Sequence, residues 1–234
     1  DATAWEVGLS CGGKISVLVM AVSEVGFPPH LLTSGMESLA ERQTVCFRLP
    51  VNGGHARKSE KVFEASKLEG DEFLFVQAPR PQLIIIGAVH ISQHLASMAI
   101  QTGFDVTVID PRRTFATAER FPGIKLVFDW PDIALDDISL DGETSLVALT
   151  HDPKIDDTAL HQVLGKPLFH IACLGSRRTH AARLERLSEA GFSDADTARI
   201  KGPAGLNIGA KTPAEIAVSV LGELVAAYRG RALQ

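Results

Sequence analysis

The sequence has little cysteine, no excess of basic residues and no long apolar run, and each absence excludes a class of protein. Its three cysteines, Cys11, Cys46 and Cys173, lie far apart and form no Cys-x-x-Cys pair. This spacing does not suggest a disulfide framework or a structural zinc site, and it favours a cytoplasmic protein. The formal net charge of -5 argues against nucleic-acid binding, which depends on basic surfaces. Apolar runs such as residues 83–86 are far too short to cross a bilayer.

The sequence also lacks the common hydrolase and ATPase motifs. Neither a Walker A sequence, nor HExxH, nor GxSxG, nor a Ser-His-Asp order is present. What is present is an ordinary globular composition, with 234 residues of which 45% are hydrophobic and 22% are charged. That length is enough for one large or two modest domains.

A domain boundary is predicted at residues 78–81, where two prolines flank Arg80. Residues 1–78 are expected to form a small α+β domain and residues 79–234 an α/β domain. The elements expected in the first domain are a strand over residues 7–19 interrupted at residues 11–13, a helix from Pro28 or Pro29 to about Arg42, and strands at residues 44–49 and 72–76.

After the boundary, strands alternate with helices, which predicts a Rossmann-like, mainly parallel sheet with helices on both faces. The final helix has the clearest start, because residues 212–215 (Thr-Pro-Ala-Glu) form a capping box with proline at the first helical position. The strands are expected at residues 82–86, 105–109, 125–128, 144–149 and 168–173, and the other helices at residues 90–102, about 157–164 and about 178–190.

The turn after the last of these strands is the most informative motif. Gly175 permits close approach of a ligand, and Ser176 leads into a helix that begins with Arg177 and Arg178. Helix N-terminal N–H groups and guanidinium groups both bind anions, so this turn predicts a phosphate-bearing ligand. The alternative is that both arginines are solvated residues of the first helical turn and that Gly175 serves only the turn.

Residues 87–92 lie where a dinucleotide-binding glycine motif belongs, and Asp110 follows where an acidic residue would bind a ribose hydroxyl. However, Val89 and Ser92 replace two of the three glycines. The Val89 side chain would occupy the path of the pyrophosphate, which disfavours NAD in its usual pose.

Another polar group, His151-Asp152-Pro153, follows the fourth expected strand. Ligands of open parallel sheets bind beyond the carboxyl ends of the strands. Gly87, Asp110 and Ser176 fall at the same ends, so the sequence predicts that all these residues line one pocket. Taken singly, His151 is instead a turn residue and Asp152 a cap of the next helix.

A third candidate is Cys11 with Gly12 and Gly13. A thiol between small residues in a bend of a strand can face a ligand and bind a soft metal. The alternative is a small buried residue beside a glycine bulge. Cys46 and Cys173 lie within strand patterns and are expected in the core.

These stretches resemble the XdhC/CoxI proteins, which are accessory factors of xanthine dehydrogenase and related molybdenum hydroxylases. The similarity keeps one order over nearly the whole chain and is carried by residues 8–13, 81–121, 149–153, 174–191 and 202–215. It implies an N-terminal XdhC/CoxI domain over residues 1–78 and a Rossmann-like domain over residues 79–234.

The resemblance further implies a maturation chaperone rather than an enzyme. Such a protein binds the molybdenum cofactor, protects it during sulfuration and passes it to an apo molybdenum hydroxylase. A cysteine desulfurase is a further expected partner, and a homodimer is expected. The implied cofactor-binding residues are Cys11, Gly12, Gly13, Gly87, His90, Asp110, His151, Asp152, Gly175, Ser176, Arg177 and Arg178, with Cys11 near the metal.

The sequence departs from the family pattern in two places. A second glycine-rich segment with its own cysteine usually precedes the Cys-Gly-Gly stretch, and nothing here matches it, so either an upstream part is absent or this is a shortened relative. Val89 stands where the family commonly has glycine. Two alternatives remain open: an NAD(P)-dependent oxidoreductase using Asp110 with His151 or His180, and a docking scaffold that does not hold the cofactor.

Overall fold

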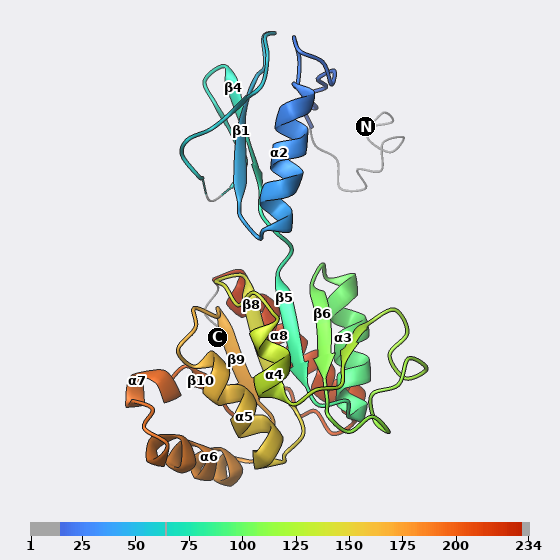
Figure 1. Ribbon diagram of the computed structural model, residues 1–234, viewed down its shortest axis with the longest axis vertical. Helices are drawn as coiled ribbons and strands as arrows, with labels where there is room; N and C mark the ends of the chain where they lie inside the picture. The colour runs from blue at the N-terminus through green and yellow to red at the C-terminus, as the bar shows by residue number, and fades with distance from the viewer. Residues whose placement is uncertain (1–14, 64, 231–234) are drawn as a thin grey trace. The chain divides into compact units, whose positions relative to one another are not determined.

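The computed structural model describes residues 15–63 and 65–230, and its contacts divide the chain into two units, Asp1–Pro79 and Arg80–Gln234 (Figure 1). No helix in the described ranges is long and apolar enough to cross a membrane.

The described residues of the first unit form an antiparallel sheet in the order β2-β1-β4-β3, and the helix α2 packs against it. In this sheet Phe47 lies opposite Phe75 and Leu49 opposite Phe73. A Cβ on Gly35 would lie 2.8 Å from Cζ of Phe47, so the glycine lets α2 approach the sheet closely. The bounds are α2 Pro29–Ala40, β1 Val45–Pro50, β2 Arg57–Lys58, β3 Lys67–Glu69 and β4 Glu72–Gln77.

The helix and the two longer strands predicted for this unit are confirmed, but the strand over residues 7–19 is wrong in its described part. Residues 15–19 belong to no strand, although Ile15, Val17 and Val19 have high β propensity. A strand needs a pairing neighbour, no described segment pairs with these residues, and Val19 is 86% exposed. Residues 7–14, with Cys11, Gly12 and Gly13, lie outside the described residues.

The second unit is built on a parallel six-stranded sheet in the order β10-β9-β8-β5-β6-β7. Successive strands run outward from β5 in one direction and from β8 in the other, so the order reverses between β5 and β8, as in dinucleotide-binding folds. The bounds are β5 Gln82–Ile86, β6 Asp105–Ile109, β7 Lys125–Val127, β8 Thr144–Ala148, β9 His170–Cys173 and β10 Ile200–Lys201.

Helices cover both faces of this sheet, which confirms the predicted fold class (Figure 1). Leu83 and Ile85 pack in one core with α3 and α8, whereas Ile84 and Ile86 pack in the other with α4, α5 and α6. The helices are α3 His90–Gln101, α4 Pro131–Asp136, α5 Pro153–Val163, α6 Arg177–Glu189, α7 Asp194–Thr197 and α8 Pro213–Tyr228.

The predicted elements of this unit are confirmed within a few residues at each end, and α8 has the predicted capping box between Thr212 and Glu215. The prediction omitted α4, α7 and β10 because elements of two to six residues contain too few periods of a hydrophobic pattern.

Candidate functional site

The carboxyl ends of β5, β6, β8 and β9 meet at one edge of the parallel sheet, as their parallel registers require. The predicted positions Gly87 and Asp110 directly follow β5 and β6. His151 and Ser176 lie in the turns that follow β8 and β9, so the structure brings all four turns to this edge. We call this edge the rim.

The turn after β5 is closed by its own polar groups. Gly87 has a φ of +104° and is buried. The Gly87 carbonyl accepts a hydrogen bond of 2.5 Å from Ser92 Oγ. A Cβ on Gly87 would lie 2.4 Å from Cγ2 of Thr150, so the turns after β5 and β8 touch where the strand order reverses. Val89 precedes α3 without a side-chain cap, and His90 is exposed at the first position of that helix.

Asp110 also binds this turn rather than facing solvent. Its carboxylate is fully buried; Oδ2 accepts the Ala88 N–H at 2.7 Å, and Arg112 donates to Oδ1 at 2.9 Å and to Oδ2 at 2.8 Å. Burial raises the pKa of Asp110, but the hydrogen bonds from Arg112 and Ala88 outweigh it and hold the pKa below its usual value. A ribose hydroxyl would therefore have to displace an existing bond.

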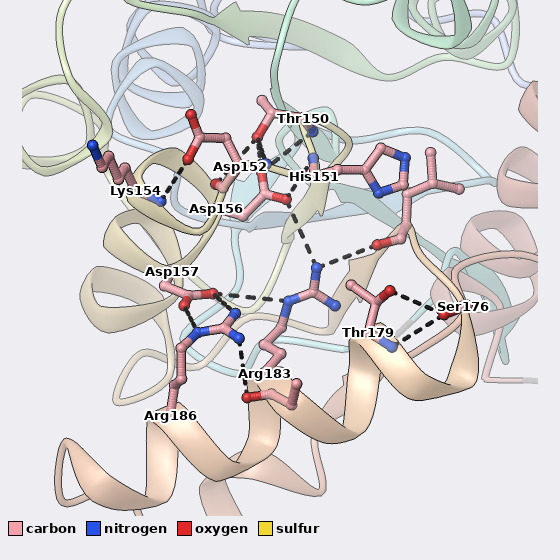
Figure 2. A network of polar contacts seen from close by, with 12 residues as sticks. Thr150, His151, Asp152, Lys154, Asp156, Asp157, Ser176, Thr179, Arg183 and Arg186 are labelled. Carbon is pink, nitrogen blue, oxygen red and sulfur yellow. Dashed lines mark hydrogen bonds and ion pairs between the residues drawn. The ribbon is translucent and has the colours of Figure 1, made fainter.

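The turn after β8 is fixed by a buried carboxylate, Asp156. It accepts the Thr150 hydroxyl at 2.6 Å and the His151 N–H at 3.1 Å, and His151 has a left-handed φ of +64° (Figure 2). Asp152 accepts the Lys154 N–H at 3.0 Å, so the alternative interpretation of Asp152 as a helix cap is confirmed. The His151 side chain is exposed.

A buried arginine lies between this turn and the next. Arg183 is 2% exposed, and its Nη2 donates to the Leu174 carbonyl at 3.2 Å and lies 3.7 Å from Oδ2 of Asp156. Its Nε lies 3.9 Å from Oδ1 of Asp157, a carboxylate that Arg186 binds with both nitrogens of its fork (Figure 2).

Within the described part of the chain, Nε and Nη1 of Arg183 have no hydrogen-bond partner, which is rare for buried nitrogens. Burial raises the pKa of Asp156, while the Thr150 hydrogen bond and the charge of Arg183 lower it in part. Arg183 is thus a buried cation beside the turns after β8 and β9, and two of its nitrogens make no hydrogen bond to a described residue.

The turn after β9 differs from the others because its charged groups are free. Gly175 has a φ of +141°, and Ser176 caps α6 by accepting the Thr179 N–H at 3.1 Å. Arg177 and Arg178 are exposed in the first turn, and neither guanidinium has an ion pair or hydrogen bond to a described residue. This exposure is compatible both with the predicted anion site and with the solvated alternative.

A cavity of about 460 Å³ adjoins this turn. Its walls come from the end of β9, the start of α6, the loop of residues 203–210 and α8, and Arg177 is the charged residue that lines it. The volume is within the range of roughly 300–1,000 Å³ typical of small-molecule sites. The sequence prediction missed this loop as a site, although Gly202, Gly205 and Gly209 mark it.

Arg112 and Arg183 were missed as well. The available signals were an arginine two residues after a strand-end acid, and an arginine four residues before Leu187 on the inward stripe of α6.

The predicted metal position, Cys11, lies outside the described residues, and among those described no cluster of three or more His, Cys, Asp or Glu side chains could hold a metal ion. Cys46 and Cys173 are buried, as predicted. Burial raises the pKa of Cys173 to about 12, so this thiol is inert packing.

The chain is similar to a known protein family and to several known proteins. Residues 83–224 match the model of the XdhC Rossmann domain. The chain is 34% identical over 155 residues to a protein of Bacillus subtilis strain 168 named as a probable xanthine dehydrogenase subunit, covering 65% of this chain and 45% of that protein. It is 26% identical over 232 residues to the molybdenum cofactor insertion chaperone PaoD of Escherichia coli strain K12, covering 96% of this chain and 63% of that protein.

An uncharacterized protein of the same Escherichia coli strain, YqeB, is 32% identical over 197 residues, which is 83% of this chain and 36% of that protein. The chain therefore spans less than two thirds of the length of each of these relatives. Among solved structures, a xanthine dehydrogenase from Bacillus halodurans superimposes with a TM-score of 0.67 at 25% identity, covering 87% of this chain and 65% of that one.

Proposed function

Because this chain belongs to the XdhC family, we propose that it serves the maturation of a molybdenum hydroxylase by binding the molybdenum cofactor, protecting it and delivering it to the apoenzyme. The cofactor is cargo in this proposal, so the chain's own residues hold, orient and release it. We assign the phosphate of the pterin to the turn after β9, and Cys11 to the neighbourhood of the metal.

The observation that carries this proposal is that Arg177 and Arg178, at the start of α6, bind no described residue through their guanidinium groups, and that Arg177 lines a cavity. Peptide N–H groups at a helix N-terminus and two guanidinium forks suit a phosphate dianion. The buried Arg183 lies behind the same turn, and its hydrogen bond to the Leu174 carbonyl holds the turn in place. Delivery requires no general acid or base, which agrees with the lack of a recognisable catalytic motif.

The NAD(P)-dependent alternative is weaker on geometric grounds. Both oxygens of Asp110 are taken by Ala88 and Arg112, and the turn at Gly87 is packed against Thr150. Val89 adds a side chain where a pyrophosphate would approach this turn. A nucleotide in the usual pose would have to open three contacts of the protein.

The test is retention of pterin. Protein incubated with molybdenum cofactor from a heat-denatured molybdoenzyme is desalted, and bound pterin is measured by fluorescence after oxidation. We expect retention by the wild type and at least a tenfold loss in Arg177→Ala/Arg178→Ala, because the phosphate then loses both guanidinium groups.

The matched control is Lys125→Ala/Lys166→Ala, which also removes two exposed positive charges from this unit but leaves the rim intact. Equal retention by the arginine variant and the wild type would refute the phosphate site. A wild type that retains no pterin but co-purifies with a hydroxylase would refute cofactor binding and favour a docking scaffold.

A further inference from the structure

We propose that the cavity between α6, the loop of residues 203–210 and α8 binds a planar heterocycle that carries a phosphate group. The ring lies on the apolar wall of the cavity, and the phosphate lies on Arg177 at its edge. The inference rests on the proposed function where it equates this ring with the pterin, and it names the place and contacts by which the ring is held.

The walls of the cavity combine apolar surface with charge of one sign. Leu174, Leu206 and Ile216 are half-buried and supply apolar wall, and Ile208 is 54% exposed. No aspartate or glutamate is among the lining residues of the described chain, so the cavity favours an anion over a cation. A flat ring that covers this wall removes apolar area from water, which favours binding.

The loop is held rigidly along its first half. Gly205 donates its N–H to Oε2 of the buried Glu223 at 3.0 Å, and Ser219 Oγ donates to the Leu206 carbonyl at 2.6 Å. Ala204 donates to the Cys173 carbonyl at 2.9 Å, which ties the loop to the end of β9. A cavity wall fixed in this way loses little freedom when a ligand binds.

His170 lies beside Glu223, with its Nε2 3.4 Å from Oε2. Gly205 has a φ of +94°, and a Cβ there would lie 2.3 Å from Ser219 Oγ, so only glycine lets the loop lie this close to α8. These contacts identify Glu223 and Ser219 as positioning residues for the cavity wall.

The second half of the loop keeps unused donors. The N–H groups of Asn207, Gly209 and Ala210 make no hydrogen bond to any described residue, and all three residues line the cavity. Ring nitrogens and carbonyl oxygens of a heterocycle, or phosphate oxygens, are suitable acceptors for such groups. Apolar wall, free amides and one guanidinium together define the class of ligand.

The test compares two exposed isoleucines changed to tryptophan. Ile208→Trp places an indole at the cavity, whereas Ile133→Trp, at a residue 57% exposed in α4, makes the same change away from it. Both positions are exposed, so neither variant should unfold the protein, and circular dichroism checks this. The probes are the molybdenum cofactor, followed by pterin fluorescence, and GMP, followed by calorimetry.

We expect Ile208→Trp to weaken retention of pterin at least tenfold and Ile133→Trp to match the wild type. If the wild type retains pterin and Ile208→Trp retains it equally well, or if both tryptophan variants lose it equally, the cavity proposal is overturned while the proposed function stands. If the wild type retains no pterin but binds GMP in a way that Ile208→Trp abolishes, the proposed function falls and the cavity site stands. Binding of neither probe overturns both.

Discussion

The turns after β5 and β9 have similar backbones, but their polar groups differ in whether they are bound within the protein. Each contains a glycine with positive φ at the carboxyl end of a central strand, and each leads into a long helix. In the β5 turn the Gly87 carbonyl and the Ala88 N–H are bound by Ser92 and Asp110. In the β9 turn the guanidinium groups of Arg177 and Arg178 bind no described residue, and Arg177 lines a cavity.

This difference teaches where a ligand can bind with the least rearrangement. In dinucleotide-binding folds the first turn of the sheet receives the phosphates. Here that position is filled by contacts within the protein, and the unused donors and positive charges lie two strands away, at the far side of β8. The strand order alone therefore does not show which turn can bind a ligand. That depends on whether the polar groups of the turn are already bound within the protein.

The largest expected effect concerns the buried cation beneath the open turn. Arg183→Met should destabilise the fold by about 3–5 kcal/mol, because it leaves the buried Asp156 without its positive neighbour. Arg186→Met is the matched control; its side chain is 39% exposed, so its loss should cost only about 1 kcal/mol. Urea unfolding measures the free energy of unfolding of both variants. A loss for Arg183→Met as small as that expected for Arg186→Met would show that Arg183 is not a structural support.

The next effect tests how tightly the closed turn is packed. Gly87→Ala and Gly103→Ala both place a side chain at positive φ, which costs about 1–3 kcal/mol. Only at Gly87 does the added Cβ meet a neighbour, Thr150 Cγ2, so this variant should lose about 1–3 kcal/mol more. Thermal or urea unfolding gives the difference, and two equally stable variants would contradict the contact between the β5 and β8 turns.

The smallest effect is a change in acid sensitivity. The pKa of Asp110 in the folded state is lowered, so its ionised form stabilises the fold above its unfolded pKa of about 3.9, and this contribution is lost as the pH falls through the folded pKa. Between pH 6 and pH 3 the wild type should therefore lose more stability than Asp110→Asn. Parallel pH profiles of urea unfolding would show that the carboxylate is not held ionised by Arg112.

Much of the fold could be predicted because the longer strands of the parallel sheet are mainly apolar runs that end at a turn. The rule that parallel strands share a carboxyl edge then placed Gly87, Asp110, His151 and Ser176 together. The strand predicted over residues 7–19 is wrong in its described part, because β propensity is a local property whereas a strand also needs a pairing neighbour.

The rest of the site depends on the orientation of side chains, which the sequence does not give. Arginine is normally exposed, so nothing local marks Arg183 as buried except its place among apolar residues of α6. Asp110 was predicted correctly in position, but whether its oxygens are available depends on where Arg112 points. The cavity wall at residues 203–210 is held by Ser219 and Glu223 of α8, which are distant from it in the sequence.

The contact between Gly87 and Thr150 also bears on any attempt to give this sheet a dinucleotide. Replacing Val89 with glycine would clear one obstacle, yet room for a pyrophosphate must still be made by moving Thr150. Thr150 holds Asp156, and Asp156 faces Arg183, which holds the Leu174 carbonyl. Moving Thr150 would therefore disturb the contacts of Asp156 and Arg183 that support the turn after β9, so a variant opened for a dinucleotide should also be less stable.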